Sequence, residues 1–270
     1  MLLCDVWGVV HNGIAAYKAA CDALVRFRES GGTVVLITNA PRPGAAVQRI
    51  LDRLDVSHGA YDAITSSGDV TRKIVESRRG QSVFHLGPER DKPIFADLDV
   101  VFAPPEHADY VVCSGLFDDT IETPEHYRDM LMAMRARSLL MVCANPDIVV
   151  ERGDALLYCA GALADAYAAL GGEVLYCGKP HAPIYQAALD AAAAARGCSA
   201  VPLQRALAIG DSVRTDLKGA AAFGLDSLFI TSGIHAEEYG GRHTPDPAAL
   251  NGIFSAAGVT PKAVMCGLKW

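Results

Sequence analysis

Short apolar segments alternate with segments of helical character along this 270-residue chain, and the alternation strongly limits its fold. In the first third, we expect three strands and two intervening helices, at residues 2–6, 17–30, 33–38, 42–54 and 62–66. Gly31 and Gly32 end the first helix, and Pro41 breaks the chain after the second strand. Strands that alternate with helices predict a doubly wound parallel sheet and therefore an α/β fold.

A second series of elements begins near Gln81. Its expected strands lie at residues 82–86, 110–113 and 139–144, and its helices start at Thr123 and Cys159. The first pattern then resumes with strands at 174–177, 206–210 and 227–231 and with helices over 183–196 and from Val213. We therefore predict a core in two parts, residues 1–79 and 178–270, with an α/β cap domain inserted at residues 80–177.

Polar side chains stand where several of the apolar runs end. They form four motifs that contain Asp5, Thr38 with Asn39, Lys179, and Asp211 with Asp216. In open α/β sheets, reacting groups collect just past the carboxyl ends of the strands. We therefore expect a carboxylate, a hydroxyl, an ammonium group and a further pair of carboxylates to meet at one edge of one sheet. Such a set suits phosphoryl transfer.

Each motif also has a structural explanation. Because an unpaired buried carboxylate is costly, Asp5 is either a nucleophile toward phosphorus or a capping residue before a turn. Thr38 either donates to a phosphoryl oxygen or belongs to a turn, and Lys179 is either a charge for the phosphoryl group or a solvated loop residue. Asp211 and Asp216 either bind Mg²⁺ or cap a helix and complement its dipole. The presence of all four motifs at strand ends favours the phosphoryl-transfer site.

Further candidates for substrate binding lie in two turns. Gly8 and Gly13 bracket a short excursion after the first strand, where a tight turn must bring the backbone close to the ligand. His11 lies in this excursion and should overhang the site. In the second series, Asn145 and Asp147 are candidates to line the substrate pocket.

The order and spacing of the motifs resemble those of the haloacid dehalogenase (HAD) superfamily, over nearly the whole chain. The subclass that the chain resembles most, IIA, has a large α/β cap between the second and third motifs. It includes phosphatases of sugar phosphates, nucleotide monophosphates, 4-nitrophenyl phosphate and pyridoxal phosphate. The resemblance implies a Rossmann-like core and a Mg²⁺-dependent phosphohydrolase that acts on a small phosphorylated metabolite.

The resemblance also implies a role for each matching position. Asp5 resembles the nucleophile that forms an aspartyl-phosphate. The backbone carbonyl of Trp7 and Asp211 resemble ligands of Mg²⁺ beside Asp5, and Asp216 resembles the carboxylate that supports the metal site. Lys179, with Thr38 and Asn39, resembles the group that holds the phosphate.

Trp7 departs from the family pattern, because the phosphatases of this superfamily have an aspartate there that protonates the leaving oxygen. Loss of general acid–base assistance should slow the turnover of alkyl phosphates by about 10²- to 10⁴-fold. His11 and His181 are candidates to replace the acid, and substrates with good leaving groups need it less. The alternative is a catalytically weak or inactive protein of the same fold that binds a phosphometabolite and has a regulatory role.

Two other functions fit less well. Carbon–halogen chemistry without a metal would not need the Asp211 and Asp216 pair. A signalling receiver domain also uses Asp, Thr and Lys, but its acidic pair precedes the phosphorylated aspartate, whereas here the pair follows it.

Composition limits the partners and the compartment. The net charge of −7 and the lack of a basic block argue against nucleic acid. No apolar run approaches the ~18 residues of a membrane span, and Asp5 interrupts the apolar N-terminal stretch, so we expect no membrane span and no signal peptide. Eight scattered cysteines without a C-x-x-C pair indicate free thiols in a reducing cytoplasm. An apolar cap surface could support a homodimer.

Overall fold

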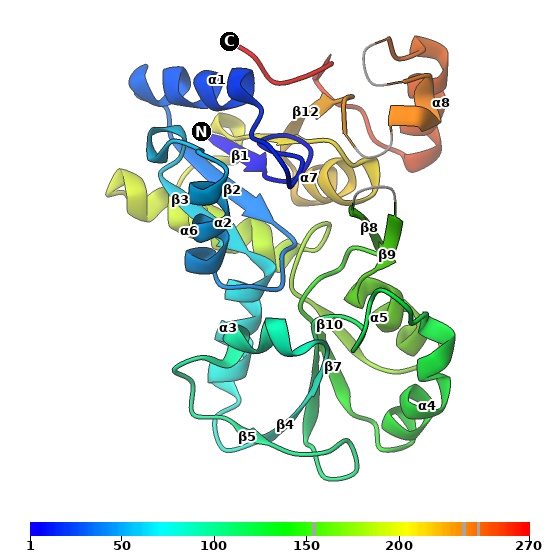
Figure 1. Ribbon diagram of the computed structural model, residues 1–270. Helices are drawn as coiled ribbons and strands as arrows, with labels where there is room; N and C mark the ends of the chain where they lie inside the picture. The colour runs from blue at the N-terminus through cyan, green and yellow to red at the C-terminus, as the bar shows by residue number, and fades with distance from the viewer. Residues whose placement is uncertain (153–154, 234–235, 242–243) are drawn as a thin grey trace. The chain divides into compact units, whose positions relative to one another are not determined.

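The computed structural model describes residues 1–152, 155–233, 236–241 and 244–270 (Figure 1). The chain forms two compact units. The first contains residues 1–38, 45–65 and 179–270, and the second contains residues 39–44 and 66–178. The bounds of 80–177 for an inserted domain stay a prediction.

The first unit is built on a six-stranded sheet in the order β13-β12-β11-β1-β2-β3. Its strands are β1 (Leu2–Asp5), β2 (Val34–Thr38), β3 (Ala63–Ser66), β11 (Leu207–Gly210), β12 (Asp226–Ile230) and β13 (Ala263–Met265). Its helices are α1 (Lys18–Glu29), α2 (Gly44–Arg53), α6 (Ala182–Arg196), α7 (Lys218–Phe223) and α8 (Pro247–Ala257). β1 pairs in parallel with both β2 and β11, and β2 is buried along its whole length, as the continuous apolar run predicts.

The register of these strands positions the polar motifs. Cys4 of β1 faces Leu36 of β2 on one side and Ile209 of β11 on the other. Asp5, Thr38 and Asp211 therefore stand at the carboxyl ends of three adjacent strands, at the same edge of the sheet.

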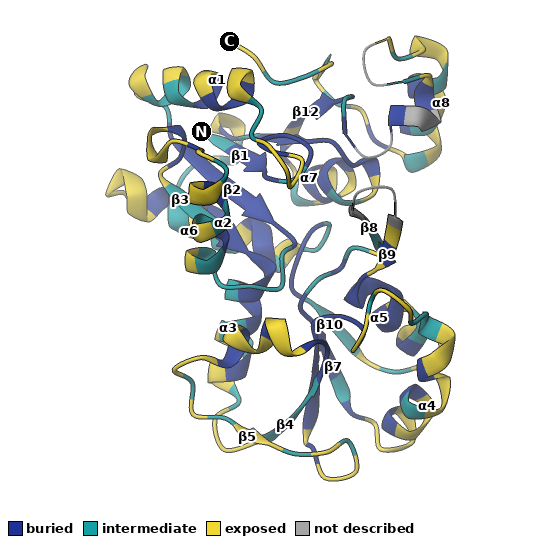
Figure 2. Ribbon diagram, in the orientation of Figure 1, coloured by how far each residue is buried: buried dark blue, intermediate teal, exposed yellow. Residues whose placement is uncertain are grey.

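The second unit has a five-stranded parallel sheet in the order β10-β7-β6-β4-β5. Its strands are β4 (Ser82–Leu86), β5 (Val101–Phe102), β6 (Tyr110–Cys113), β7 (Leu140–Cys143) and β10 (Val174–Tyr176). Its helices are α3 (Ser67–Ser77), α4 (Arg128–Ala136) and α5 (Ala160–Ala169), and β8 (Val149–Arg152) pairs antiparallel with β9 (Ala155–Tyr158). Leu131 of α4 and Leu163 and Tyr167 of α5 pack in one core with Val111 and Met141 of the sheet. Figure 2 shows that the central strands of both sheets are largely buried.

The structure confirms the α/β fold with parallel sheets flanked by helices. The helix expected from Thr123 begins as a 3₁₀ turn, Pro124–Tyr127, before it continues as α4. The helix expected from Val213 begins as a π-helical turn, Val213–Leu217, and continues as α7. Helices α3 and α8 and strands β5, β8, β9 and β13 were not predicted from the sequence.

All eight cysteines belong to the described part of the chain, and all are free thiols, as their spacing predicts. Among the described helices, none combines the length and the apolar character that crossing a bilayer requires.

Candidate active site

Three carboxylates of the first unit meet at the carboxyl edge of its sheet. Asp5 ends β1, Asp211 follows β11, and Asp216 lies in the π-helical turn after it. Each of the three offers an oxygen that lies within 4.8 Å of the oxygens of the other two. Their residues are only 3–6% exposed, so water screens their mutual repulsion poorly.

Lys179 is the basic group that joins two of these carboxylates. Its Nζ donates to Oδ1 of Asp5 at 2.5 Å and to Oδ1 of Asp216 at 2.6 Å. The lysine is 3% exposed, so both ion pairs are removed from water. The sequence separates Lys179 from Asp5 by 174 positions, and the fold brings them into contact.

The electrostatics of the cluster follow from this burial. Desolvation raises the pKa of Asp5, the charge of Lys179 lowers it, and the charge of Asp216 raises it, so that the resulting pKa is about 7. Burial alone would lower the pKa of Lys179, but Asp216 and Asp5 outweigh it and hold that pKa well above its usual value. The lysine therefore keeps its charge at neutral pH.

The cluster fits a small divalent cation. Three carboxylates and one ammonium group leave two negative charges in a buried site when all three carboxylates are ionised. Carboxylate oxygens are the hard ligands that Mg²⁺ takes, and Mg²⁺ is usually bound through one or two of them together with water and phosphate. The donor set and its charge both suit such an ion.

Glycines make the close approach of these carboxylates possible. A Cβ on Gly8 would lie 2.0 Å from Oδ2 of Asp211, and a Cβ on Gly233 would lie 1.9 Å from the same oxygen. A Cβ on Gly210 would lie 2.1 Å from Cγ of Asp216. No side chain larger than hydrogen fits at these three positions unless a carboxylate moves.

We expect Gly210→Ala to destabilise the protein by about 1–3 kcal/mol, because the new methyl group overpacks against a buried, ion-paired carboxylate. The matched control is Gly252→Ala in α8, where no atom lies within 4 Å of the added Cβ. That exchange should stabilise the protein by about 0.5–1 kcal/mol, because glycine is the poorer helix former. Urea unfolding of the two variants measures both effects, and equal stability of the two would contradict this packing.

The loop after β1 holds Trp7 in place. The Gly8 N–H donates to the His11 carbonyl at 2.8 Å, and the Gly13 N–H donates to Nδ1 of His11 at 2.9 Å. The rings of Trp7 and His11 meet edge to face with centroids 5.3 Å apart. A Cβ on Gly13 would lie 2.3 Å from the indole of Trp7, so that the indole packs directly over the glycine backbone. Gly8 and Gly13 both have a φ of +84°, a conformation that glycine adopts without strain.

His11 is buried and neutral at pH 7, because desolvation lowers its pKa to about 4. Between pH 6.5 and 4 the unfolded chain binds a proton at this position and the folded chain does not. The free energy of unfolding should therefore fall by up to about 3 kcal/mol as the pH drops through this range. Comparison with His11→Asn, whose Oδ1 can accept the Gly13 bond, isolates this contribution in urea unfolding at pH 7 and pH 4.5. An identical pH dependence of the two proteins would contradict the burial of an uncharged imidazole.

The remaining predicted residues fall in two places. In the first unit, Thr38 is buried at the end of β2, and His181 is half-buried at the start of α6. In the second unit, Nδ2 of Asn39 donates to Oδ1 of Asp147 at 2.9 Å, and the Asp147 N–H donates to Oδ1 of Asn145 at 3.1 Å. Asn39, Asn145 and Asp147 thus form a hydrogen-bonded group of their own.

The structure adds residues that sequence reasoning missed. The Ser212 N–H donates to Oδ2 of Asp216 at 3.1 Å, and the Tyr185 hydroxyl donates to the Asp216 carbonyl at 3.3 Å. Ser212 stands at the N-terminal cap of the π-helical turn, a position that a serine before a helix could have indicated. Tyr185 and Gly233 have no comparable local signal, because only the folded chain brings them to the carboxylates.

The fold and the cluster define a class of protein, an α/β protein with a buried carboxylate and lysine site at the carboxyl edge of a parallel sheet. Two family models match this chain. One, described as haloacid dehalogenase-like hydrolase, matches residues 2–101, and one described as HAD-hydrolase-like matches residues 176–253.

Known proteins extend the comparison to the whole chain. The crystal structure of a hydrolase of the haloacid dehalogenase-like family from Brucella suis 1330 is 47% identical, has a TM-score of 0.86, and covers 99% of this chain and 94% of its own. The 5'-nucleotidase YutF of Bacillus subtilis (strain 168) is 23% identical over 239 residues, 88% of this chain and 89% of its own. A p-nitrophenyl phosphatase from Archaeoglobus fulgidus shares the fold, with 19% identity, a TM-score of 0.76, and coverage of 98% of this chain and 95% of its own. The chain belongs to the haloacid dehalogenase-like hydrolase family.

Proposed function

We propose that this protein is a Mg²⁺-dependent phosphohydrolase that acts on a small phosphorylated metabolite through Asp5. The observation that carries the proposal is the buried contact of Lys179 with both Asp5 and Asp216, next to Asp211. Phosphoryl transfer depends mainly on positioning and on neutralising the charge of the phosphoryl oxygens. The names of two similar proteins, a 5'-nucleotidase and a p-nitrophenyl phosphatase, agree with this class of reaction.

Each residue of the cluster has a distinct role in this proposal. A carboxylate oxygen of Asp5 attacks phosphorus, the bond from phosphorus to the leaving oxygen breaks, and water later hydrolyses the aspartyl-phosphate. Lys179 orients Asp5 and supplies positive charge to the phosphoryl oxygens. Asp5, Asp211 and the Trp7 carbonyl would hold Mg²⁺, which supplies further positive charge when it is bound.

The remaining residues would support the metal site or hold the substrate. Asp216 would support the metal site and hold the ammonium group of Lys179 in position. Thr38 and Asn39 would donate to the phosphoryl group, and Gly8 would leave room for Asp211. Residues 80–177 would act as a cap domain that selects the substrate, with Asn145 and Asp147 among its lining residues. A homodimer stays a prediction.

Trp7 determines which phosphates turn over fast. The indole of Trp7 does not donate a proton and take it back at neutral pH, as a carboxyl group does. The buried His11 is uncharged at that pH. Substrates whose leaving group is already a weak base need no proton during cleavage. We therefore propose that acyl and aryl phosphates react faster than alkyl phosphates.

A second candidate function, the binding of a phosphometabolite without turnover, follows from the position of the Trp7 indole. Trp7 packs over Gly13 and against His11, so that its ring is a fixed part of the loop after β1. A protein of this fold that binds a phosphometabolite without turnover would keep the lysine and the carboxylates and would not need an acid at position 7.

A panel of phosphate esters tests the two functions against each other. We expect hydrolysis of 4-nitrophenyl phosphate and acetyl phosphate with Mg²⁺, none with EDTA, and recovery when Mg²⁺ is restored. Glycerol phosphate should react more slowly by about 10²-fold or more, because its leaving group needs an acid. A raised melting temperature with these esters, without release of phosphate from any of them, would favour the binding protein.

A further inference from the structure

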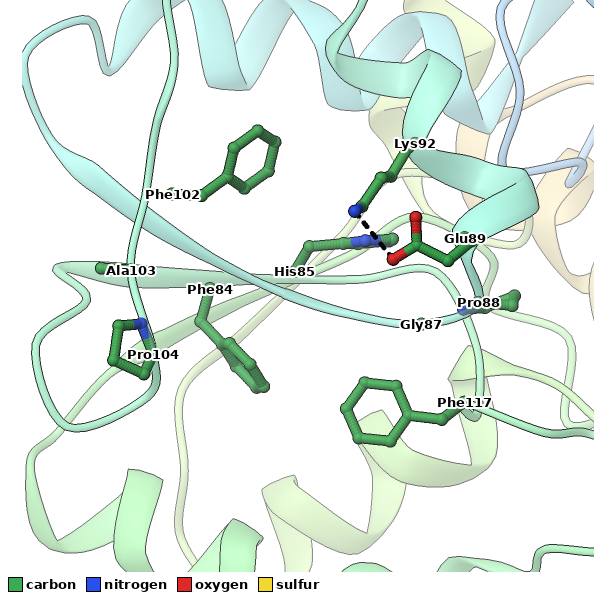
Figure 3. Close-up of a pocket in the computed structure, with 10 residues that line it drawn as sticks. All are labelled: Phe84, His85, Gly87, Pro88, Glu89, Lys92, Phe102, Ala103, Pro104 and Phe117. Atoms are coloured by element: carbon green, nitrogen blue, oxygen red, sulfur yellow. Dashed lines mark ion pairs between the residues drawn. The ribbon is translucent and has the colours of Figure 1, made fainter.

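The second unit contains a pocket of about 530 Å³ at one edge of its five-stranded sheet (Figure 3). This volume lies within the range of roughly 300–1,000 Å³ that is typical of small-molecule sites. All the residues that line it belong to the second unit, and none of them belongs to the acidic cluster. The pocket can therefore be considered independently of the chemistry at Asp5.

The pocket exists because the edge strand β5 ends early. β5 pairs with β4 at only two positions, Ser82 with Val101 and Val83 with Phe102. The last bond of this ladder runs from the Ala103 N–H to the Val83 carbonyl at 3.0 Å. The next two residues of the chain are Pro104 and Pro105, which have no N–H to continue it.

The missing pairing leaves a backbone donor and acceptor at the sheet edge. Carbonyls along β4 point alternately to its two neighbours. The Leu86 carbonyl accepts from Ser114 on the β6 side, and the Val83 carbonyl accepts from Ala103 on the β5 side. The N–H and C=O of His85 therefore point to the β5 side. In the described part of the chain, no residue bonds to either of them.

Aromatic rings stand above and below this open edge. Phe84 and His85 are consecutive in β4, so their side chains lie on opposite faces of the sheet, as Figure 3 shows. Phe102 lies on the same face as His85, and Phe117 lies on the same face as Phe84 (Figure 3). Phe102 is 52% exposed and Phe117 is 44% exposed, an unusual amount of aromatic surface to leave in water around one pocket.

The walls are held in place by neighbours outside the pocket. Phe95 is buried and meets both His85 and Phe102 edge to face, with centroids 5.2 and 5.0 Å apart. Nε2 of His85 bonds to the Ser114 hydroxyl at 2.9 Å. Phe117 packs against the buried ring of Tyr127 at 5.7 Å. A site with rings fixed in advance loses little conformational entropy on binding.

We propose that this pocket binds a flat heteroaromatic ring with an adjacent hydrogen-bond donor and acceptor, as a nucleobase has. The edge of the ring bonds to the N–H and C=O of His85, and its two faces stack on the aromatic side chains of the two walls. Lys92 and Glu89, an ion pair at 2.7 Å, line the same pocket and offer a donor and an acceptor to substituents of the ring. An added peptide strand fits less well, because β4 ends at Leu86 and leaves the N–H and C=O of His85 as the single backbone pair of this strand to extend.

Binding of adenosine to the full-length protein tests the proposal by isothermal titration calorimetry. Adenosine carries no phosphate, and the titration is repeated with Asp5→Asn, so the result does not depend on catalysis. We expect saturable binding in both proteins. Phe102→Ala and Phe117→Ala should each weaken it by about tenfold, because each removes one stacking ring. Met132→Ala, which removes a 50% exposed apolar side chain from α4, should not change it.

A second probe tests the hydrogen-bond pair. Indole and adenine are flat two-ring systems of similar size, but indole has a donor without an adjacent acceptor, so it should bind at least about tenfold more weakly than adenine. Equal binding of indole and adenine would overturn the nucleobase assignment. Absence of saturable adenosine binding, or binding that neither phenylalanine variant weakens, would overturn the pocket itself. Both phenylalanines are half-exposed, and melting temperatures close to that of the parent protein show that the variants fold.

Discussion

Replacing Asp5 by asparagine should reduce hydrolysis of 4-nitrophenyl phosphate by between about 10⁴- and 10⁶-fold. The amide keeps the size of the carboxyl group, but it is not a nucleophile toward phosphorus. It also removes one of the two negative partners of Lys179 and one candidate ligand of Mg²⁺. Steady-state release of phosphate, measured with saturating Mg²⁺, gives the size of the loss.

The control for this experiment is Asp62→Asn. Asp62 lies beside Val34, the first residue of β2, at the end of that strand opposite to Thr38. The Asp62 carboxylate accepts from the Val34 N–H at 2.8 Å and pairs with Arg28 at 2.6 Å, far in sequence from every predicted site residue. Its loss should lower the melting temperature without a large change in turnover. If Asp5→Asn and Asp62→Asn reduced turnover equally, the losses would reflect stability, and Asp5 would not be the nucleophile.

Replacing Trp7 by aspartate should raise the rate with glycerol phosphate by about 10²- to 10⁴-fold. The change places a carboxyl group two residues after Asp5, where it can protonate the leaving oxygen and then activate water. The rate with acetyl phosphate should rise much less, because its leaving group needs no proton. The ratio of kcat/KM for the two substrates measures the effect and is insensitive to differences in the amount of folded protein.

Trp7→Asn is the matched control for the gain. Both exchanges remove the indole from Gly13 and His11 and leave a similar space, but only aspartate adds an acid. An equal gain in both variants would mean that the indole blocks access to the site and that acid catalysis is not what the protein lacks. No gain in either variant, in a protein that still hydrolyses acetyl phosphate, would contradict the proposed role of this position.

Most strands could be predicted because a buried parallel strand leaves a continuous apolar run. β2 reads Val-Val-Leu-Ile-Thr and is buried throughout, and the expected bounds of β4 and β6 agree with the structure. β5 could not be predicted, because it is two residues long and both are exposed. Helix α3 was missed although Ser66 and Asp69 form a capping box at its start, since the polar residues within it obscure the apolar pattern.

Of the candidate site, only the residues that stand near the ends of apolar runs could be predicted from the sequence. Asp5 ends β1 and Asp211 follows β11, an adjacent strand of the same parallel sheet, so the topology of that sheet brings them to one edge. The apolar run before Lys179 is β10, which belongs to the five-stranded sheet, so the expectation that this run is a strand of the same sheet was wrong. The contacts that shape the cluster depend on residues without such a signal. Gly233 gives room to Asp211, and Tyr185 reaches Asp216 from α6, and neither role is apparent from neighbours in the sequence.

The most direct test of the account is to trap the phosphorylated protein. The protein is mixed with acetyl phosphate and Mg²⁺, quenched in acid within the first turnover, digested, and examined by mass spectrometry. We predict one phosphoryl group on the N-terminal peptide that contains Asp5, absent when Asp5→Asn is treated in the same way. Turnover without a phosphorylated Asp5 peptide, or a phosphoryl group on a different residue, would contradict the central claim.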